Sequence, residues 1–304
     1  MKQSLIIRLS NNIGNQMFMY ASAYSFAKKL KRELLIDDET AYSGKKKIYT
    51  YHLNIFDIKS NSAPINYKFL GLKGYLRRKT LKYFDRFNKN KNFYIEPKDI
   101  NKKTVFNQNA MNANFTNPLY IEGHFETEKY FIEHAKDIKK EFTFKNISTF
   151  KNNKIFKDIK NSNSVSICVR QNRFSERKRA ITNEDQINSK VFTGDQIKYI
   201  NKAINIIKSK ISDPKFFIWS NDHKNLNNHF PLREYTPVST NDVGCDLFLM
   251  TQSKHFVVIP SSYNWWGAWL NENKNGIILR PSNNHFTNFS LNNKDFWPDT
   301  WTKI

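Results

Sequence analysis

The stretch that most constrains how this chain can fold is DLFLMTQSKHFVVIPSSYNWWGAWL, residues Asp246 to Leu270. It opens with apolar residues at helical spacing, and the β-preferring run 256–259 suits a buried parallel strand. Pro260 ends that strand, and apolar residues return at helical spacing from Trp265 onward. The stretch therefore predicts a strand, a hydroxyl-rich turn and a helix in direct succession.

The turn between this strand and helix carries Ser261, Ser262 and Tyr263. Free backbone N–H groups and the helix dipole favour an anion at a helix N-terminus, and serine hydroxyls add hydrogen-bond donors. The turn is therefore a candidate phosphate site. The alternative is a serine-capped helix that its tryptophans pack against a sheet, and spacing alone does not choose between the two.

The N-terminus shows the same order of elements. Leu5–Leu9 is a short β-type run, a polar turn follows, and apolar residues at helical spacing begin at Met17. Within the turn, asparagines tolerate positive φ, and Gly14 lets the backbone approach a ligand closely. The turn is a candidate ligand loop, and an ordinary polar strand-to-helix turn is the alternative.

A further strand, Val165–Val169, delivers Arg170 at its C-terminal end, which is the ligand edge of an open α/β sheet. Cys168 shares a face with Arg170 because side chains alternate along a strand. The planar guanidinium can hold a diphosphate through charge-assisted hydrogen bonds worth about 1.5–3 kcal/mol each. The alternative is an arginine in a surface salt bridge. Glu176, in the loop that follows, is near enough in sequence to be a candidate base.

The length of 304 residues suits two domains of ordinary size. Strand and helix patterns alternate in both halves, which argues for two doubly wound α/β domains that face each other across a cleft. The Lys- and Asn-rich segment 151–163 is the predicted linker, and it divides the chain into domains 1–160 and 161–304. Within the second domain we expect a charged loop over 174–188 and an amphipathic helix over 194–211.

The net charge of +22, from 49 Lys and Arg against 27 Asp and Glu, attracts anionic partners such as nucleic acid, a membrane leaflet or a nucleotide-sugar. No helix-turn-helix, zinc-finger, RRM or KH signature accompanies the charge, so we expect no nucleic-acid partner.

The segment 68–91 holds nine basic residues against the single acid Asp85, with aromatic residues interleaved. It could lie on an anionic membrane or grip an extended acceptor glycan, and the alternative is a solvated helix with one buried face.

Several classes of protein are disfavoured by what the sequence lacks. Cys168 and Cys245 are the only cysteines, so a disulfide scaffold is not expected. No DxD follows any strand and the histidines lack metal-ligand spacing, so we expect no metal and no cofactor.

No apolar run approaches the ~20 residues of a membrane span, and the N-terminus has no signal-peptide core. The expected location is the cytoplasm. Peripheral contact with the inner face of the cytoplasmic membrane stays open as a further expectation.

Several blocks of the sequence resemble one known family, the bacterial α-1,2-fucosyltransferases of glycosyltransferase family 11. The stretch 246–270 resembles that family's C-terminal motif, and DFWPDTWTKI at 295–304 resembles its ending. NNIGNQMFMYA at 11–21 is similar to the opening block GGLGNQMFQYA, with two asparagines where two glycines are usual. YIEGHFETEKYF at 120–131 resembles a block of the type YLDGYWQSEKYF. The resemblance runs from residue 5 to the C-terminus, with unmatched loops between the blocks.

The match departs most from the family at its HxRRxD motif, where this chain reads CVRQNR. The departures are Cys168 for the histidine, Gln171 for the second arginine and Arg173 for the acid. Arg170 keeps the first arginine, which in the family meets the β-phosphate of the donor. The strand 216–219 ends in Ser-Asn-Asp, similar to the family's SDD, and this resemblance implies that Asp222 contacts guanine.

The resemblance implies a GT-B arrangement with GDP-fucose as the donor. It implies inverting transfer of L-fucose to the 2-hydroxyl of a terminal β-galactoside, with a lipid-linked oligosaccharide of surface polysaccharide or O-antigen synthesis as one form of the acceptor. Arg170 and Asn15 would be the catalytic residues. The donor-binding residues would be Gly14, Asn15, Cys168, Arg170, Asp222, Asp246, Ser261, Ser262 and Tyr263.

The general base is left open by the sequence, which offers Glu126, Glu128 and Glu176. Glu126 stands where the family usually has glutamine, so it adds a carboxylate that could face the cleft. Glu126 and Glu128 could equally do no more than favour the positive end of a helix dipole.

Two other functions stay open beside the transferase. The first is a non-catalytic basic module of the same fold that binds a glycan or nucleic acid, which the eroded HxRRxD motif makes conceivable. The second is a structural protein at the membrane surface that rests on the segment 68–91. Retention of Arg170, Asp222, the paired serines and the Gly-Asn-Gln loop favours the enzyme, because a simple binding protein has no need of all of them.

Overall fold

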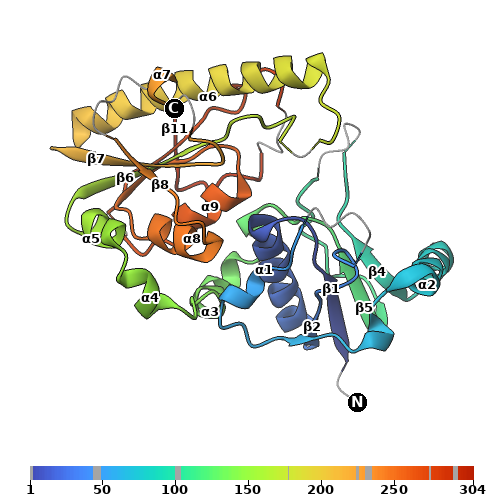
Figure 1. Cartoon of the computed structure of the whole chain (residues 1–304). Helices are drawn as coiled ribbons and strands as arrows, with labels where there is room; N and C mark the ends of the chain where they lie inside the picture. Colours follow the sequence, from blue (N-terminus) through green and yellow to red (C-terminus); the bar gives the residue numbers. More distant parts are fainter. Residues whose placement is uncertain are drawn as a thin grey trace. The chain divides into compact units, whose positions relative to one another are not determined.

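The computed structural model of the chain describes residues 3–43, 49–99, 104–176, 178–223, 226–229, 235–273, 275–289 and 294–304. The chain forms two compact units, Met1–Lys145 and Asn146–Ile304, and each is built on a parallel β-sheet (Figure 1). The predicted class of two doubly wound α/β units is confirmed. Among the helices that the structure describes, none is long and apolar enough to cross a membrane.

The first unit has one sheet with strand order β3-β2-β1-β5-β4. Its strands are β1 (Ser4–Arg8), β2 (Glu33–Asp37), β3 (Asn61–Ser62), β4 (Lys91–Ile95) and β5 (Phe115–Glu122). Its helices are α1 (Ile13–Lys29), α2 (Gly71–Asp85) and α3 (Ala135–Glu141), with 3-10 turns η1 (Leu53–Ile55), η2 (Ile65–Tyr67), η3 (Glu128–Tyr130) and η4 (Ile132–His134). The chain adds strands outward from β1 to β3 and then fills the other side of β1, so the order reverses between β1 and β5.

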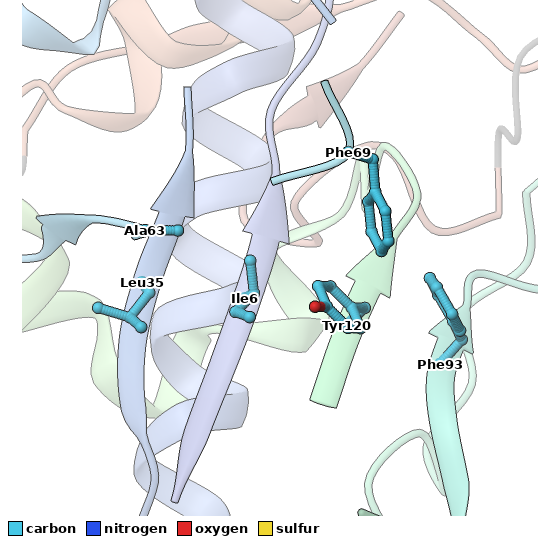
Figure 2. Close-up of a cluster of buried hydrophobic side chains, with 6 residues drawn as sticks. All are labelled: Ile6, Leu35, Ala63, Phe69, Phe93 and Tyr120. Carbon is cyan, nitrogen blue, oxygen red and sulfur yellow. The ribbon is translucent and has the colours of Figure 1, made fainter. Parts of the chain in front are cut away.

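A buried apolar cluster crosses one face of this sheet and consists of Ile6, Leu35, Ala63, Phe69, Phe93 and Tyr120 (Figure 2). The strand register aligns the row, because Ile6 is paired with Leu35 on one side and with Tyr120 on the other. Leu81 of α2 packs against the same cluster, whereas α1 lies on the opposite face of the sheet (Figure 2). The sheet is therefore covered on both faces, as a parallel sheet requires.

The second unit has one sheet with strand order β11-β10-β9-β6-β7-β8. Its strands are β6 (Asn163–Val169), β7 (Pro214–Ser220), β8 (Tyr235–Val238), β9 (His255–Val257), β10 (Ile278–Arg280) and β11 (Thr302–Lys303). Its helices are α4 (Ile147–Lys151), α5 (Lys154–Lys160), α6 (Asn183–Lys210), α7 (Leu226–His229), α8 (Val243–Thr251) and α9 (Ser262–Trp269). In Figure 1, α6 covers one face of this sheet, and α5, α8 and α9 cover the other. The strand order reverses between β6 and β9.

The tryptophans of α9 anchor the C-terminal segment to the second sheet. Trp265 is fully buried, its indole Nε1 donates to the carbonyl oxygen of Phe296 at 2.9 Å, and its ring centroid lies 5.5 Å from that of Trp301. The chain then ends in β11, which pairs with β10. The two C-terminal blocks of the sequence are therefore parts of one core.

The helix predicted over 194–211 begins earlier, at Asn183, so the charged loop predicted over 174–188 ends at Thr182. A capping box sets this start. The Asp185 backbone N–H donates to the Thr182 hydroxyl at 3.2 Å, and the Thr182 N–H donates to the Asp185 carboxylate at 3.1 Å. This reciprocal pair satisfies two of the N–H groups that a helix start leaves open, and it outweighs the weak apolar periodicity of the first turns.

Along the chain, the first unit ends at Lys145 and the second begins at Asn146, before the predicted boundary between residues 160 and 161. The linker predicted over 151–163 is wrong, because most of it forms α5, which packs on β6 and α8 of the second unit. Apolar residues at helical spacing explain this: Ile159 is buried, and the ring of Phe156 stacks on that of Phe248. The Lys- and Asn-rich composition concealed a helix with one apolar face.

The segment after Gly123, where the sequence left open that Glu126 and Glu128 lie at the start of a helix, forms the short turns η3 and η4. Phe125 has φ 54°, in the left-handed region, and this interrupts any helix between β5 and η3. The loop that follows β5 therefore has an irregular path, which places Glu126 next to the first turn of α1, as described below.

Candidate active site

Two loops meet where the strand order of the second sheet reverses. Arg170 follows β6 and Pro260 follows β9, and these strands are neighbours. Arg173 ties the two loops together, because its guanidinium donates to the carbonyl oxygen of Pro260 at 3.1 Å and lies 3.9 Å from the centroid of the Phe289 ring. Ligands of open α/β sheets bind at such a reversal, outside the carboxyl ends of the strands. Arg173 thus has a connecting role here, where the family motif has an acid.

Arg170 is held at both its backbone and its side chain. Its N–H donates to the side-chain oxygen of the buried Gln196 in α6 at 2.9 Å. Its guanidinium forms an ion pair with Glu176, and the same carboxylate accepts a hydrogen bond from the Asn221 amide at 2.9 Å. A guanidinium and an amide therefore converge on one carboxylate, an arrangement that suits recognition of any oxyanion.

The loop after β6 is locked to the end of β7. Gln171 donates its N–H to the Asn221 side chain and accepts from that amide on its carbonyl, both at 2.8 Å. Its own side-chain amide donates to the carbonyl oxygen of Asp222 at 2.6 Å. Asn172 allows the turn, because it adopts φ 54°, which asparagine tolerates better than most residues. Gln171, the replacement for the second arginine of the family motif, is thus a buried positioning residue beside Arg170 and Asp222.

A cavity of about 840 Å³ opens beside this loop. Gln171, Asn172 and Glu176 line it from the loop, and Gly194 and its neighbours line it from α6. A methyl group on Gly194 would meet nothing within 4 Å, so the wall is open at this point. The Glu176 side of the ion pair therefore faces a volume of ligand size.

Cys168 is buried under the same edge, and two further predicted donor residues, the half-buried Asp246 and Tyr263, lie near it. Burial and the nearby Asp246 carboxylate raise the pKa of the Cys168 thiol. Burial also raises the pKa of Asp246, which accepts from both the N–H and the hydroxyl of Thr240 at 2.9 Å. The Tyr263 hydroxyl donates to the carbonyl oxygen of Val243 at 3.0 Å, and burial raises its pKa. These groups support the loops around Arg170 through the packing of β6, α8 and α9.

Ser261 stands at the N-cap of α9 with φ −147°, and its hydroxyl makes no capping hydrogen bond within the described residues. Asn264 instead fixes the turn, because its buried side-chain oxygen accepts from the N–H of Ile259 at 2.8 Å. The first turn of α9 contains no acidic residue. The interpretation of a merely serine-capped helix is therefore not supported, whereas the packing of its tryptophans is.

His223 is a site residue that the sequence did not single out. Both of its ring nitrogens are buried and make no hydrogen bond to any described residue. It lies near the Asp246 carboxyl and acts to lower the pKa of that group, although burial raises this pKa overall. The only signal in the sequence was its place directly after Asp222, at the carboxyl end of β7.

The corresponding edge of the first unit brings the Gly-Asn-Gln loop to the loop after β5. Asn15 donates to the Glu126 carboxylate at 2.6 Å, and the side chains of Asn11 and His124 are joined at 2.8 Å. Asn11 has φ 62°, which explains how an asparagine replaces the usual glycine. Gly14 is buried in the first turn of α1, so this reversal between β1 and β5 is closely packed.

Gln16 fixes the start of α1. It is fully buried, donates to the carbonyl oxygens of Asn11 and Thr50 at 2.8 and 2.7 Å, and accepts from the N–H of His52 at 2.8 Å. The bonds to Thr50 and His52 join the turn after β1 to a loop far away in the sequence. The Gln of the Gly-Asn-Gln loop is therefore a positioning residue for Asn15.

Glu96 holds the loop that carries Glu126, a role that no pattern in the sequence indicates. Its carboxylate accepts the N–H groups of His124 and Phe125 at 2.7 and 2.9 Å. Burial raises the pKa of Glu96 to about 7. Gly123 is needed beside it, because a Cβ there would lie 2.4 Å from that of Glu96. Glu128, the third candidate base, lies in the first turn of η3.

A metal site has no candidate in the described part of the chain, where no three His, Cys, Asp or Glu side chains are grouped to hold an ion. That the reaction needs no metal stays a prediction.

Comparison with known proteins gives a consistent result along the whole chain. The profile of "Glycosyl transferase family 11" matches residues 1–304. An α-1,2-colitosyltransferase of Escherichia coli is 26% identical, with 99% of this chain and 98% of that protein aligned. The O-antigen biosynthesis glycosyltransferase WbnK of Escherichia coli is also 26% identical, with 97% and 99% aligned.

Among solved structures, the fold is similar to that of the α-1,6-fucosyltransferase NodZ from Bradyrhizobium, which was soaked with GDP-fucose. The TM-score is 0.54 at 11% identity, and the alignment covers 89% of this chain and 93% of NodZ. This likeness confirms the predicted GT-B type of fold. Because the family profile spans all of the sequence, the chain belongs to glycosyltransferase family 11.

Proposed function

We propose that this glycosyltransferase moves L-fucose from GDP-fucose to the 2-hydroxyl of a terminal β-galactoside, with inversion at the anomeric carbon. The arrangement of Arg170 carries the proposal. It lies at the reversal of the second sheet, and its guanidinium already holds an anion, the Glu176 carboxylate, beside a cavity. A diphosphate offers the same kind of oxygen atoms to that guanidinium and to the Asn221 amide.

On the donor side of the reaction, the protein would have to stabilise the negative charge of the leaving group. As the bond between the fucose C1 and the phosphate oxygen breaks, its electron pair leaves with GDP and the β-phosphate gains negative charge. Arg170, the hydroxyls of Ser261 and Ser262 and the N-terminus of α9 would stabilise this charge. Asp222 would accept the N–H groups of guanine, and Gln171 holds its backbone in place.

The acceptor side is proposed for the first unit. As the acceptor oxygen forms its bond to C1, its proton has to move to a base. We assign that role to Glu126, because the amide of Asn15 orients its carboxylate and it is partly exposed. Glu176 is less suited, since it lies beside Arg170 and Asn221 on the donor side of the reaction. Proton transfer by a positioned carboxylate is typically worth 10²–10⁴ in rate.

A second donor is favoured by one observation. The α-1,2-colitosyltransferase that resembles this chain is named for another sugar, colitose, which is a deoxygenated relative of fucose. Both donors would present the same GDP to Arg170 and Asp222, so the two proposals share one donor site and differ only in the sugar.

The test is a transfer assay with GDP-fucose and GDP-colitose as alternative donors and lactose as the acceptor, with EDTA present. We expect a product heavier by one fucose, with a 1,2-linkage to galactose by NMR. Transfer of colitose alone would replace the sugar and keep the site. Loss of activity with EDTA, with recovery on addition of a divalent cation, would reject the metal-free mechanism. A lipid-linked oligosaccharide of O-antigen synthesis is the acceptor class that we propose for the cell.

A further inference from the structure

Helix α2 has a fixed inner face. Gly74 is the point of closest approach, because a Cβ there would lie 2.2 Å from the backbone of Phe69. Arg77 lies over the Phe69 ring at 4.9 Å and donates to the carbonyl oxygen of Lys68 at 2.8 Å. Leu81 packs against the buried cluster of the first sheet. The helix therefore cannot rotate, and its remaining faces have defined directions.

Two of its basic residues are directed inward and are neutralised there. Arg78 forms a bidentate pair with Glu122 at 2.6 and 2.5 Å, and Lys82 contacts the same carboxylate at 2.5 Å. Glu122 is buried at the end of β5. Asp85, the one acid of the segment 68–91, also turns inward and accepts hydrogen bonds from Asn92. The outer surface of this segment is thus left without a negative charge.

The outward stripe of α2 is apolar and aromatic. Leu72, Leu76, Lys79 and Tyr83 follow one another at helical spacings of four, three and four, so they share one face. Leu72 is 73% exposed and Leu76 is 52% exposed. In an ordinary surface helix this face is polar. Here the apolar side chains are exposed to solvent, and such exposure is typical of a surface that binds a partner.

The turn after the helix extends this surface. Phe87 is 74% exposed and its ring centroid lies 5.8 Å from that of Tyr83, which is itself next to the exposed Phe84. The exposed cations that border these side chains are Lys73, Lys79, Arg86 and Lys89. We call the set of Leu72, Lys73, Tyr75, Leu76, Lys79, Tyr83, Phe84, Arg86, Phe87 and Lys89 the α2 surface.

We propose that the α2 surface docks on an anionic lipid bilayer, with the helix axis parallel to the membrane plane. Leucine and aromatic side chains flanked by lysine and arginine are the composition of helices that insert between headgroups. The absence of any acid on this surface decides against a second copy of the chain, because two such faces would oppose cations to cations. An anionic leaflet complements both the charge and the apolar stripe.

This inference is independent of the proposed transfer reaction. The residues of the α2 surface carry no role in the candidate active site, so docking and turnover can be measured separately. Docking would hold the enzyme at the surface where lipid-linked acceptors are found, and would raise their local concentration without altering the chemistry.

The experiment is sedimentation of the full-length protein with vesicles of phosphatidylcholine, with and without phosphatidylglycerol. We expect binding only to the anionic vesicles, weakened by high salt. Lys79→Glu with Arg86→Glu should weaken it at least ~10-fold, the effect of reversing two surface cations. Leu72→Ser with Leu76→Ser should weaken it similarly at constant charge. Turnover on soluble lactose should be unchanged in both.

The matched control is Lys208→Glu with Lys210→Glu, which makes the same change in net charge at exposed positions of α6. The control should bind vesicles nearly as well as the wild type. Equal loss in the control would mean attraction by net charge alone and would overturn the proposal. So would unchanged vesicle binding in the serine variant. A dimer in solution that the serine variant disrupts, without vesicle binding by the wild type, would assign the surface to a second copy.

Discussion

Asn15 donates its side-chain amide to the Glu126 carboxylate at 2.6 Å, and this bond joins the loops after β1 and β5. The two residues are far apart in the sequence, and the reversal of strand order between β1 and β5 brings them together. Asn15 can orient the carboxylate but cannot take up a proton itself. In the proposed mechanism, Asn15 therefore positions the carboxylate and Glu126 takes up the proton.

Replacement of Glu126 tests this division of roles. Glu126→Gln keeps the shape of the side chain and an oxygen that can accept from Asn15, but removes the base. We expect kcat to fall by at least ~100-fold with little change in the KM for GDP-fucose. Glu128→Gln is the control and should retain most of the activity. Steady-state rates near those of the wild type in Glu126→Gln would remove Glu126 from the mechanism.

Arg170→Ala should lower kcat/KM by at least ~100-fold, the lower range for loss of one donor that stabilises transition-state charge. The physical reason is the charge that develops on the leaving diphosphate, which Asn221 alone cannot balance. The side chains of Gln196 and Asn221 accept from the backbone N–H groups of Arg170 and Gln171, so the loop should keep its path in the variant. Measurement of GDP release gives the rate, and circular dichroism checks the fold. Near-normal turnover would contradict the assignment.

Glu176→Gln should have the opposite effect on nucleotide binding. Glu176 occupies the guanidinium of Arg170 in this structure, so GDP that binds there as proposed would have to displace it. A partly exposed ion pair is worth up to about 1 kcal/mol, which corresponds to about a 5-fold lower Kd for GDP when the competing charge is removed. Titration calorimetry with GDP measures this. A higher Kd would mean that Glu176 holds Arg170 in its binding position.

Two lysines of α2 should differ in their effect on stability. Lys82→Glu places a carboxylate against Glu122, which is buried, so we expect a loss of about 1–3 kcal/mol in the free energy of unfolding. Lys79→Glu changes an exposed residue and should stay within about 0.5 kcal/mol of the wild type. Urea unfolding of both variants gives the comparison. Equal stabilities would show that Lys82 is not engaged with Glu122 in solution.

The pH dependence of stability should carry the signature of Glu96. Burial raises its pKa from 4.5 in the unfolded chain to about 7. Between these values the folded state binds more protons than the unfolded state, so stability falls as the pH rises. The full shift corresponds to about 3 kcal/mol. Glu96→Gln stays neutral and can still accept the N–H groups of His124 and Phe125, so it removes this dependence.

Urea unfolding at pH 5 and pH 8 measures the effect of Glu96→Gln. The variant should gain about 3 kcal/mol relative to the wild type when the pH is raised from 5 to 8. The same difference in stability at both pH values would mean that Glu96 titrates normally.

Local patterns allowed much of the fold to be predicted. Strand, turn and helix around Pro260 and around Gly14 follow from periodicity and from turn residues, because those signals lie within a few residues of one another. The end of β6 at Arg170 was predictable for the same reason. α5 and the start of α6 were missed, since lysine and asparagine masked the apolar face of the first and a capping box, not periodicity, sets the second.

Contacts between distant residues were out of reach. Glu96 binds the backbone after Gly123, and Arg78 with Lys82 binds Glu122, but a single sequence carries no sign of either pairing. Because these two cations turn inward, the exposed surface of α2 carries fewer charges than the sequence of the helix indicates. Likewise, both His223 nitrogens are buried near Asp246, a residue distant in the sequence, which spacing cannot reveal.

The most direct test of fucosyl transfer through Arg170 is GDP release from GDP-fucose by the wild type and by Arg170→Ala, each with and without lactose. We expect release by the wild type that depends on lactose and matches the amount of fucosylated product, and release at least ~100-fold slower in the variant. Contradiction would be equal release by the two proteins, or no release and no GDP binding by the wild type, which would favour a non-catalytic binding module of the same fold.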